Sequence, residues 1–151
     1  TMKRFLLGLT ITLFMTTANA HPQDNLTPEG LMHYYLKVLN DENLPALQDV
    51  YHFPHIKLVS GQLVVVQDTT VPVIDIDGLK KSGWKYSKIK NIKVLNQGDN
   101  AALIEMNFSR FDAQDKEILN QTTYYNLTKN KGYWQIISIH SMGALAGVKA
   151  K

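Results

Sequence analysis

Histidine and carboxylate side chains are the groups in this chain that can move protons near neutral pH. His52 and His55 flank Phe53-Pro54, and Glu105 lies within a strictly alternating stretch further along the chain. Imidazole titrates near neutral pH, and a carboxyl group removed from water has a raised pKa and can serve as a base. The candidate catalytic residues are therefore His52, His55 and Glu105.

Two other roles remain open for the two histidines. Packing in the loop that leads into a strand is the more common role, and metal binding is the other. A metal site would need a third histidine or an acidic partner at a supporting spacing, and the sequence offers neither near His52 and His55. The chain has no cysteine, which excludes disulfides, thiolate ligands and a thiol nucleophile. We expect neither a metal nor a cofactor.

Two helices are predicted ahead of these residues. Thr27-Pro28-Glu29-Gly30 has the form of a helix start, with a capping hydroxyl followed by proline. The apolar residues that follow recur at helical spacing: Leu31, Tyr34, Tyr35, Val38 and Leu39. A second, shorter helix is expected over Leu44–Tyr51, and Pro54 ends that segment.

The pattern changes to that of β-strands after Pro54. Two extended pieces are expected at residues 56–59 and 63–66 around Gly61, followed by a short helix at Ile76–Lys81. Four strands make up most of the rest: residues 86–95, 101–111, 118–128 and 133–140. The Gly- and Ala-rich tail after them is expected to fray. Helices followed by a meander of strands indicate an α+β domain.

The first 20 residues have the three parts of a cleavable secretory signal. Lys3 and Arg4 form the basic start, an apolar run covers residues 5–15, and Ala18-Asn19-Ala20 gives the small-x-small cleavage pattern. The apolar run is about half of the roughly 20 residues needed to span a bilayer. We expect cleavage near Ala20, a single domain over residues 21–151, and a periplasmic or secreted location.

Charge and hydropathy exclude two further classes of protein. The whole chain has a formal net charge of +3, and Lys3 and Arg4 of the signal account for two of these charges. The remaining balance gives no general electrostatic case for nucleic-acid binding. After the signal, no stretch is long and apolar enough to span a membrane. We therefore expect no nucleic-acid partner and no membrane span in the mature chain.

The order of elements and several short motifs resemble the nuclear transport factor two-like superfamily, the cone-shaped fold of the ketosteroid isomerases, scytalone dehydratase and SnoaL-like polyketide cyclases. The motifs are Leu44-Pro45-Ala46-Leu47, Tyr51-His52-Phe53-Pro54-His55, Ala101-Ala102-Leu103-Ile104-Glu105, Arg110-Phe111-Asp112-Ala113, and Tyr125-Asn126-Leu127 leading to Gly132-Tyr133-Trp134-Gln135-Ile136. The resemblance covers nearly all of residues 21–151. It implies a curved, mainly antiparallel sheet wrapped around N-terminal helices, with a pocket inside the cone. The most similar members have no assigned activity.

Ketosteroid isomerases need a carboxylate base and two oxyanion donors, a tyrosine and a protonated acid. Alignment of Leu39–Val59 with that family places Tyr35 at the tyrosine, Asn107 at the protonated acid and Val59 at the base. A phenol and an amide can both hydrogen-bond to an oxygen, but valine cannot accept a proton. Loss of the base costs roughly 10²–10⁴-fold in rate. The resemblance therefore predicts no ketosteroid isomerase chemistry, and histidine with tyrosine, as in scytalone dehydratase, is the alternative.

The strand at residues 101–111 decides which side chains reach the implied pocket. If Asn107 points into the cone, its alternate neighbours Ile104, Met106 and Phe108 point outward. An apolar row on the outer face of a sheet needs a cover, and in this superfamily a second copy often provides it. We therefore predict a homodimer through Ile104, Met106 and Phe108. In the opposite arrangement these three residues form the core, and the amide faces water.

The predicted ligand pocket combines the residues aligned above with aromatic residues and with His140, which shares strand parity with Trp134. Its members are Tyr35, Val59, Trp84, Glu105, Asn107, Tyr125, Trp134 and His140. Core packing is the alternative role for the aromatic members. Arg110 is expected to pair with an acid at the sheet rim or to bind a ligand carboxylate.

Three functions stay open at this level. The first is an exported small-ligand-binding or accessory domain with a mainly apolar pocket. The second is a lyase- or isomerase-like enzyme that uses histidine and tyrosine, and the third is a dimeric protein-interaction module. An open cavity with converging polar groups would favour the first two, whereas a cone filled by side chains would favour the third.

Overall fold

The computed structural model describes residues 20–148, so the predicted signal peptide lies, apart from Ala20, outside the described range. Three helices are present: α1 (Pro28–Asn40), α2 (Leu44–Asp49) and α3 (Ile76–Lys81). Each begins at a side-chain cap that accepts a backbone N–H three residues on, from Thr27, Asn43 and Asp75. Along the described residues, no helix is both long and apolar enough to cross a bilayer.

Six strands form a single sheet in the order β2-β1-β6-β5-β4-β3. Their bounds are β1 Tyr51–Val59, β2 Gln62–Val66, β3 Tyr86–Gln97, β4 Ala101–Phe111, β5 Glu117–Lys129 and β6 Trp134–Ser141. Neighbouring strands are antiparallel except for β1 and β6, which run parallel. The predicted α+β class with a mainly antiparallel sheet is confirmed.

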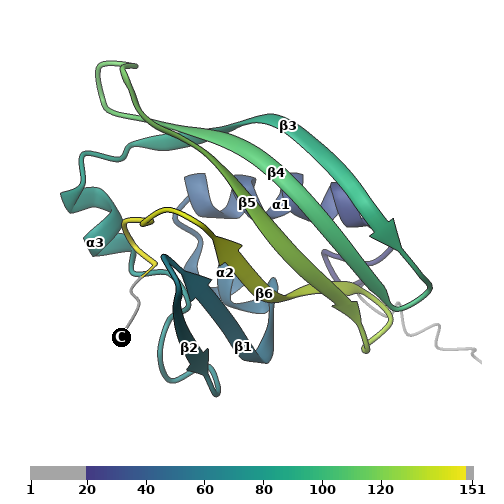
Figure 1. Cartoon of the computed structure of the whole chain (residues 1–151). Coiled ribbons are helices and arrows are strands. Elements are labelled where there is room, and N and C mark those ends of the chain that lie inside the picture. The colour runs from purple at the N-terminus through teal and green to yellow at the C-terminus, as the bar shows by residue number, and fades with distance from the viewer. Residues whose placement is uncertain (1–19, 149–151) are drawn as a thin grey trace, which may run out of the picture.

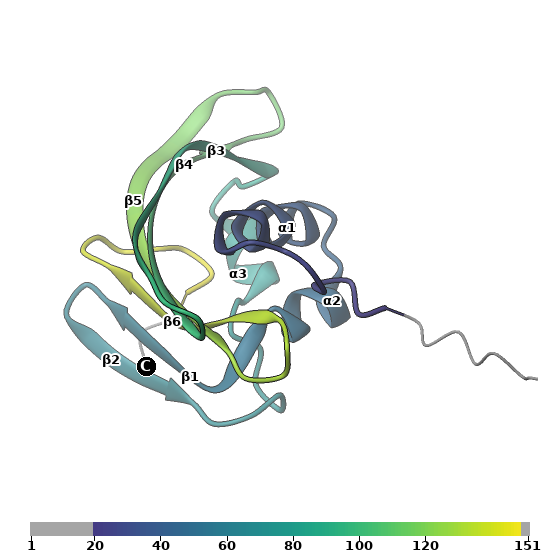
Figure 2. The same cartoon turned by 90° about the vertical axis from the view of Figure 1, so that its right-hand side faces the viewer.

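The sheet curves around the helices and gives the molecule its cone shape (Figures 1 and 2). Figure 2 shows β3, β4 and β5 arching over α1, with the β1–β2 hairpin at the opposite side of the sheet. Helix α1 lies on the concave face and packs mainly against β3. The cone implied by the resemblance is therefore confirmed.

Strand β1 begins earlier than the sequence indicates. Tyr51 already pairs with Ile136 of β6, although a helix was expected up to this residue and a strand only from Ile56. The pairing is interrupted between Tyr51 and Ile56, where Phe53-Pro54 lies with a cis peptide bond. Because proline has no N–H to offer a β-ladder, the strand is irregular at this point and its start is hidden from the pattern.

The apolar row of β4 faces the helices. Ile104, Met106 and Phe108 are 0 %, 1 % and 4 % exposed and belong to the hydrophobic core. Asn107 points to the outer face, where its amide hydrogen-bonds to Asn120 of β5 at 3.2 Å. The prediction that Asn107 faces the cone and that the apolar row forms a dimer face is therefore wrong. Burial of large apolar side chains contributes about 1.5–3 kcal/mol each, and an inward amide would offset part of that gain.

An extra residue in β6 places His140 on the outer face. The register between β5 and β6 shifts at Ile137, which has no partner on β5. Such a bulge reverses the face of every residue after it, so Ile136 and Ile139 both face the core at 0 % and 1 % exposure. His140 then pairs with Tyr124 on the outer face, and its assignment to the pocket is wrong.

Residues 142–148, which follow β6, are packed against the domain and not frayed as expected, whereas the last three residues of the tail lie outside the described range. Leu145 and Val148 are buried in the main core. The guanidinium Nη1 of Arg110 donates to the backbone carbonyl of Ala146 at 2.9 Å. Residues 142–148 therefore cover part of the concave face.

Candidate functional site

A cavity of about 620 Å³ lies beneath the β1–β2 hairpin, and this volume is within the usual range for small-molecule sites. Residues of the β1–β2 hairpin form one wall, and residues from the connection between β2 and α3, within 67–75, form another. Most of the wall is aliphatic, with Val64, Val66, Val71 and Val73 among its residues. The cavity is therefore suited to an apolar body.

Lys57 supplies the cationic group of this cavity. It lies on β1 between Val64 of β2 and Ile139 of β6, and it is 6 % exposed. Its Nζ donates to the carbonyl of Val73 at 3.4 Å, and among the described residues it forms no ion pair. Burial lowers the pKa of Lys57, because a low-dielectric environment disfavours the charged form.

Two carboxylates also line the cavity, and both have partners within their own segment. Asp68 accepts hydrogen bonds from the hydroxyl and the N–H of Thr70 at 2.6 and 2.8 Å. The bond from the hydroxyl holds the pKa of Asp68 below its usual value. Asp75 accepts from the N–H of Gly78 at 2.9 Å and caps α3. Lys57 and the valine walls are therefore the surfaces best placed to meet a ligand.

A second polar cluster lies inside the cone, where three buried tyrosines meet. The ring centroid of Tyr35 on α1 lies 5.9 Å from that of Tyr51 and 6.1 Å from that of Tyr125. Burial raises the pKa of all three phenols, because the phenolate is disfavoured away from water. The cluster therefore holds protonated hydroxyl groups at neutral pH.

His55 and Arg110 border the tyrosine cluster. His55 Nδ1 donates to the carbonyl of Ile136 at 3.1 Å, which leaves Nε2 as an acceptor, buried and without a hydrogen-bond partner. Burial lowers the pKa of His55 to about 4, so the imidazole is neutral at pH 7. The Nε of Arg110 is likewise buried without a partner, and burial lowers the pKa of this guanidinium.

The interior of the cone has almost no free space. The cavity beside Tyr35, Arg110 and Tyr125 measures about 10 Å³, roughly the room that one water molecule requires. Leu145 and Val148 of the tail line this small space. A ligand larger than water would have to displace the tail to reach the tyrosines.

The structure does not bring the predicted pocket residues together. Tyr35 and Tyr125 meet inside the cone, as described above. Three others are buried in the core at 3–4 % exposure: Val59, Trp84 and Trp134. Three lie on the outer face of the sheet: Glu105, Asn107 and His140. The pocket-lining role of the buried residues stays a prediction.

The predicted catalytic residues lie apart from one another. Glu105 pairs with Lys93 of β3 on the outer face, at 3.2 Å between Oε1 and Nζ, so its assignment as an inward base is wrong. His52 lies beside the β5–β6 turn, where Asn130 Nδ2 is 2.6 Å from its Nε2, and only His55 reaches the cone. In residues 20–148, no group of three or more His, Cys, Asp or Glu side chains is placed to hold a metal ion.

Lys57 was missed by the analysis of the sequence, although the sequence contains a signal for it. His55, Lys57 and Val59 alternate along β1 and therefore share one face. Val59 had been assigned to the interior, which places the lysine there too. A lysine at an inward position of a strand is uncommon, since lysine is almost never fully buried without a partner.

Residues 24–144 match the model of a family described as NTF2-like protein (DUF6841). This chain belongs to that NTF2-like family. Among curated proteins, none matches it significantly.

Solved structures share the fold of this NTF2-like protein. One from Shewanella oneidensis, an NTF-2 like protein of unknown function, has 19 % identity and a TM-score of 0.55 over 74 % of this chain and 92 % of its own. A putative calcium/calmodulin dependent protein kinase II association domain from Xanthomonas campestris has 20 % identity and a TM-score of 0.53 over 89 % and 98 %. An NTF2-like protein of unknown function from Pseudomonas putida has 14 % identity and a TM-score of 0.55 over 82 % and 89 %.

Proposed function

We propose that this NTF2-like protein is a small-ligand-binding domain, and that the cavity beneath the β1–β2 hairpin holds the ligand. The ligand class is an apolar molecule with one carboxylate. The observation that carries this proposal is Lys57, a buried ammonium group without an ion pair among the described residues, in a largely aliphatic cavity of about 620 Å³.

The ammonium group of Lys57 favours an anionic head group beside it. A buried charge is costly unless it is paired and hydrogen-bonded. Lys57 has three donor hydrogens and uses one of them for a long bond of 3.4 Å to Val73. A carboxylate in the cavity would accept from the other two and compensate the charge, while the valine walls would bury its apolar part.

The cone interior is a weaker candidate for the ligand site. The space beside Tyr35 and Tyr125 measures about 10 Å³, which leaves no room for a substrate there. Enzyme chemistry by histidine and tyrosine would require the tail to leave first. The cavity beneath the hairpin needs no such movement.

We also propose that the domain acts after export, in the periplasm or outside the cell, because the first 20 residues have the form of a cleavable signal.

Paired measurements of decanoate and 1-decanol binding test the proposal, because these molecules share a chain and differ in the head group. We expect the wild-type protein to bind decanoate at least about tenfold more tightly at pH 7, since hydrogen bonds to charged groups contribute about 1.5–3 kcal/mol. Lys57→Met should remove the preference for the acid and keep the alcohol. Titration calorimetry or competition with a fluorescent fatty acid gives both affinities.

Two further variants control this experiment. Lys88→Met removes an exposed lysine from β3 and should change neither affinity. Val71→Trp adds bulk at an exposed wall residue, 58 % exposed, and should weaken both ligands. Absence of decanoate binding to the wild-type protein, or an unchanged preference in Lys57→Met, would sink the proposal.

A second candidate function is a homodimeric interaction module that uses the outer face of the sheet. The filled cone favours this reading, and the β1–β2 end of the outer face exposes apolar side chains. Ile56, Leu63 and Val65 are 39 %, 66 % and 44 % exposed, and Ile56 pairs directly with Val65. The occupant that we propose for this surface is a second copy of the chain.

A further inference from the structure

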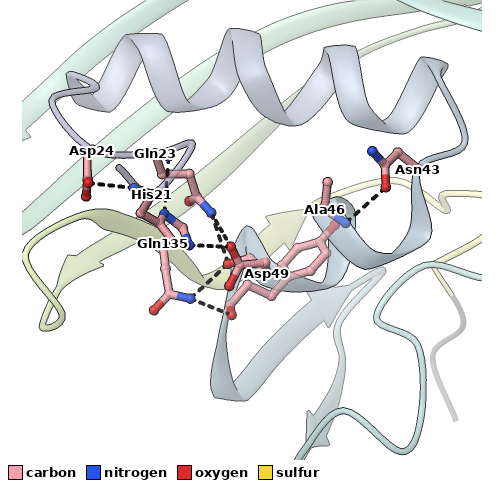
Figure 3. Close-up of polar contacts among 8 residues, drawn as sticks. His21, Gln23, Asp24, Asn43, Ala46, Asp49 and Gln135 are labelled. Carbon is pink, nitrogen blue, oxygen red and sulfur yellow. Dashed lines mark hydrogen bonds and ion pairs between the residues drawn. The ribbon is translucent and has the colours of Figure 1, made fainter. Parts of the chain in front are cut away.

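The segment ahead of α1 is fixed to the domain by His21 (Figure 3). His21 Nε2 lies 2.7 Å from Asp49 Oδ2 at the end of α2, and its ring stacks on Tyr133 with centroids 3.9 Å apart. Gln23 is fully buried and donates from Nε2 to the same carboxylate at 3.0 Å. The first described residues are therefore an ordered part of the domain.

The backbone nitrogen of His21 faces a carboxylate. It donates to Asp24 Oδ2 at 2.7 Å, and the N–H of Asp24 donates back to the carbonyl of His21 at 2.8 Å. Ala20, one residue earlier, is exposed. The Ala20–His21 bond therefore lies at the surface, at the end of the Ala18-Asn19-Ala20 pattern that signal peptidases cut.

Positive charge is scarce around this nitrogen. Asp24 contacts the nitrogen itself, and the imidazole of His21 contacts the carboxylate of Asp49 and the ring of Tyr133. Burial and these two carboxylates raise the pKa of Tyr133. In residues 20–148, neither Asp24 nor Asp49 forms an ion pair with a lysine or arginine. An added cation at this place would therefore be favourable.

We propose that hydrolysis of the bond between Ala20 and His21 supplies that cation, and that the new α-ammonium group of His21 pairs with Asp24 and locks the segment to the domain. Water adds across the bond: its oxygen goes to the carboxyl group of Ala20, and the His21 nitrogen gains hydrogens. The nitrogen then carries three hydrogens and a positive charge in place of one amide hydrogen. Asp24 is already within bonding distance, and charge-assisted hydrogen bonds are roughly twice as strong as neutral ones.

The first part of the test is the position of the cut. The whole chain, with its own leader, is expressed in a bacterium and recovered from the periplasm or medium. Intact-mass measurement and N-terminal sequencing should give His21 as the first residue. A chain that keeps its leader, or that starts at any other residue, overturns the proposal.

The second part compares two chains prepared by a fusion protease, one that starts at His21 and one that keeps Ala20. In the longer chain the His21 nitrogen stays an amide, as in the uncut protein, and the charge moves one residue outward. We expect the His21 chain to unfold at a temperature about 2–5 °C higher at pH 6–7.

Asp24→Asn, introduced into both chains, is the matched control and should abolish the difference. The advantage should also depend on pH. A free α-amino group has a pKa of about 8, and pairing with Asp24 raises it in the folded chain. While Asp24 is ionised, the stabilisation is therefore complete below about pH 8 and lost as pH rises through the raised pKa. Equal unfolding temperatures of the two chains, or a difference that survives Asp24→Asn, would count against the lock.

Discussion

At the scale of single residues, His55 shows how burial fixes a protonation state. Its Nδ1 is occupied by the carbonyl of Ile136, and its ring lies 4.9 Å from that of Tyr51. The remaining nitrogen is buried and has no hydrogen-bond partner in the described part of the chain, so a positive charge there would be poorly stabilised. The fold therefore accommodates only the neutral imidazole.

This burial predicts an acid-sensitive stability. The pKa of His55 is about 4 in the folded chain, against 6.5 for the free side chain. Between these values the unfolded chain binds the proton more readily, so stability falls as pH falls from about 6.5 to 4. The loss attributable to His55 is about 3 kcal/mol. Urea unfolding across this pH range measures it.

Two variants separate His55 from other acid effects. His55→Phe keeps a ring in place and should flatten the pH profile, at some cost in stability at pH 7 from the lost hydrogen bond. His33→Gln removes an exposed histidine of α1 and should leave the profile in place. A profile that persists in His55→Phe would show that another group is responsible.

Side-chain type alone was a poor guide to the site. His52, His55 and Glu105 were selected because their groups can move protons, yet they lie on different parts of the fold. The residue that we propose as the ligand-binding group is Lys57, which stands out because it is buried. Whether one charged residue is buried depends on the whole sheet. The pattern of a single strand indicates such burial only when the inward face of that strand is already known.

At the scale of elements, β4 is the strand on which the pocket and dimer predictions depended. Its alternation was recognised from the sequence, and the strand has the expected bounds of Ala101–Phe111. The face was assigned wrongly because the resemblance aligned Asn107 with a pocket residue. The apolar row had the stronger physical claim to the core, and the alternative that placed it there was correct.

Substitutions on the two faces of β4 should therefore differ in cost. Met106→Ala should destabilise the protein by about 2–5 kcal/mol, because it leaves a cavity under α1. Leu103→Ala shortens an apolar side chain on the outer face, where it is partly exposed, and should cost about 1 kcal/mol or less. Chemical denaturation measures the free energy of unfolding of both variants, and the two values can be compared if the m-values agree. A larger loss for Leu103→Ala would reverse the face assignment.

Two irregularities in the sheet made the bounds and faces of β1 and β6 hard to predict from the sequence. The bulge at Ile137 changes the face of β6 halfway along, and Phe53-Pro54 interrupts the ladder of β1. The bulge is defined only by pairing with β5, and the proline hides the start of β1, so neither strand has a regular periodic signal along its full length. The helices were predicted more closely, since caps and proline positions are local: α1 and α3 begin where expected.

At the scale of the whole molecule, none of the helices within residues 20–148 covers the convex face of the sheet (Figure 2). Its central part carries a row of amide and hydroxyl groups, where Asn107 bonds to Asn120 and Asn126 bonds to Ser138. Its β1–β2 end carries the exposed apolar residues. The homodimer stays a prediction, and the surface that we now propose for it is this apolar end of the outer face and not the β4 row.

The proposed dimer predicts a concentration-dependent mass. Analytical ultracentrifugation of the wild-type protein should show twice the mass of the processed chain, and Leu63→Lys should shift it toward the monomer, because a charge would be buried at the contact. Leu44→Lys, at a comparably exposed leucine of α2 (52 % against 66 %), is the matched control. A wild-type monomer at all concentrations excludes the dimer.

The tail has one more consequence. Residues 142–148 follow the last strand, and Leu145 and Val148 pack beside α1, the β4 row and Arg110. The rest of the domain therefore holds residues 142–148 much as a receptor holds a short peptide. A synthetic heptapeptide with the sequence of residues 142–148 is expected to compete with the tail for this contact in trans. A bulky purification tag fused behind the tail is expected to weaken the contact.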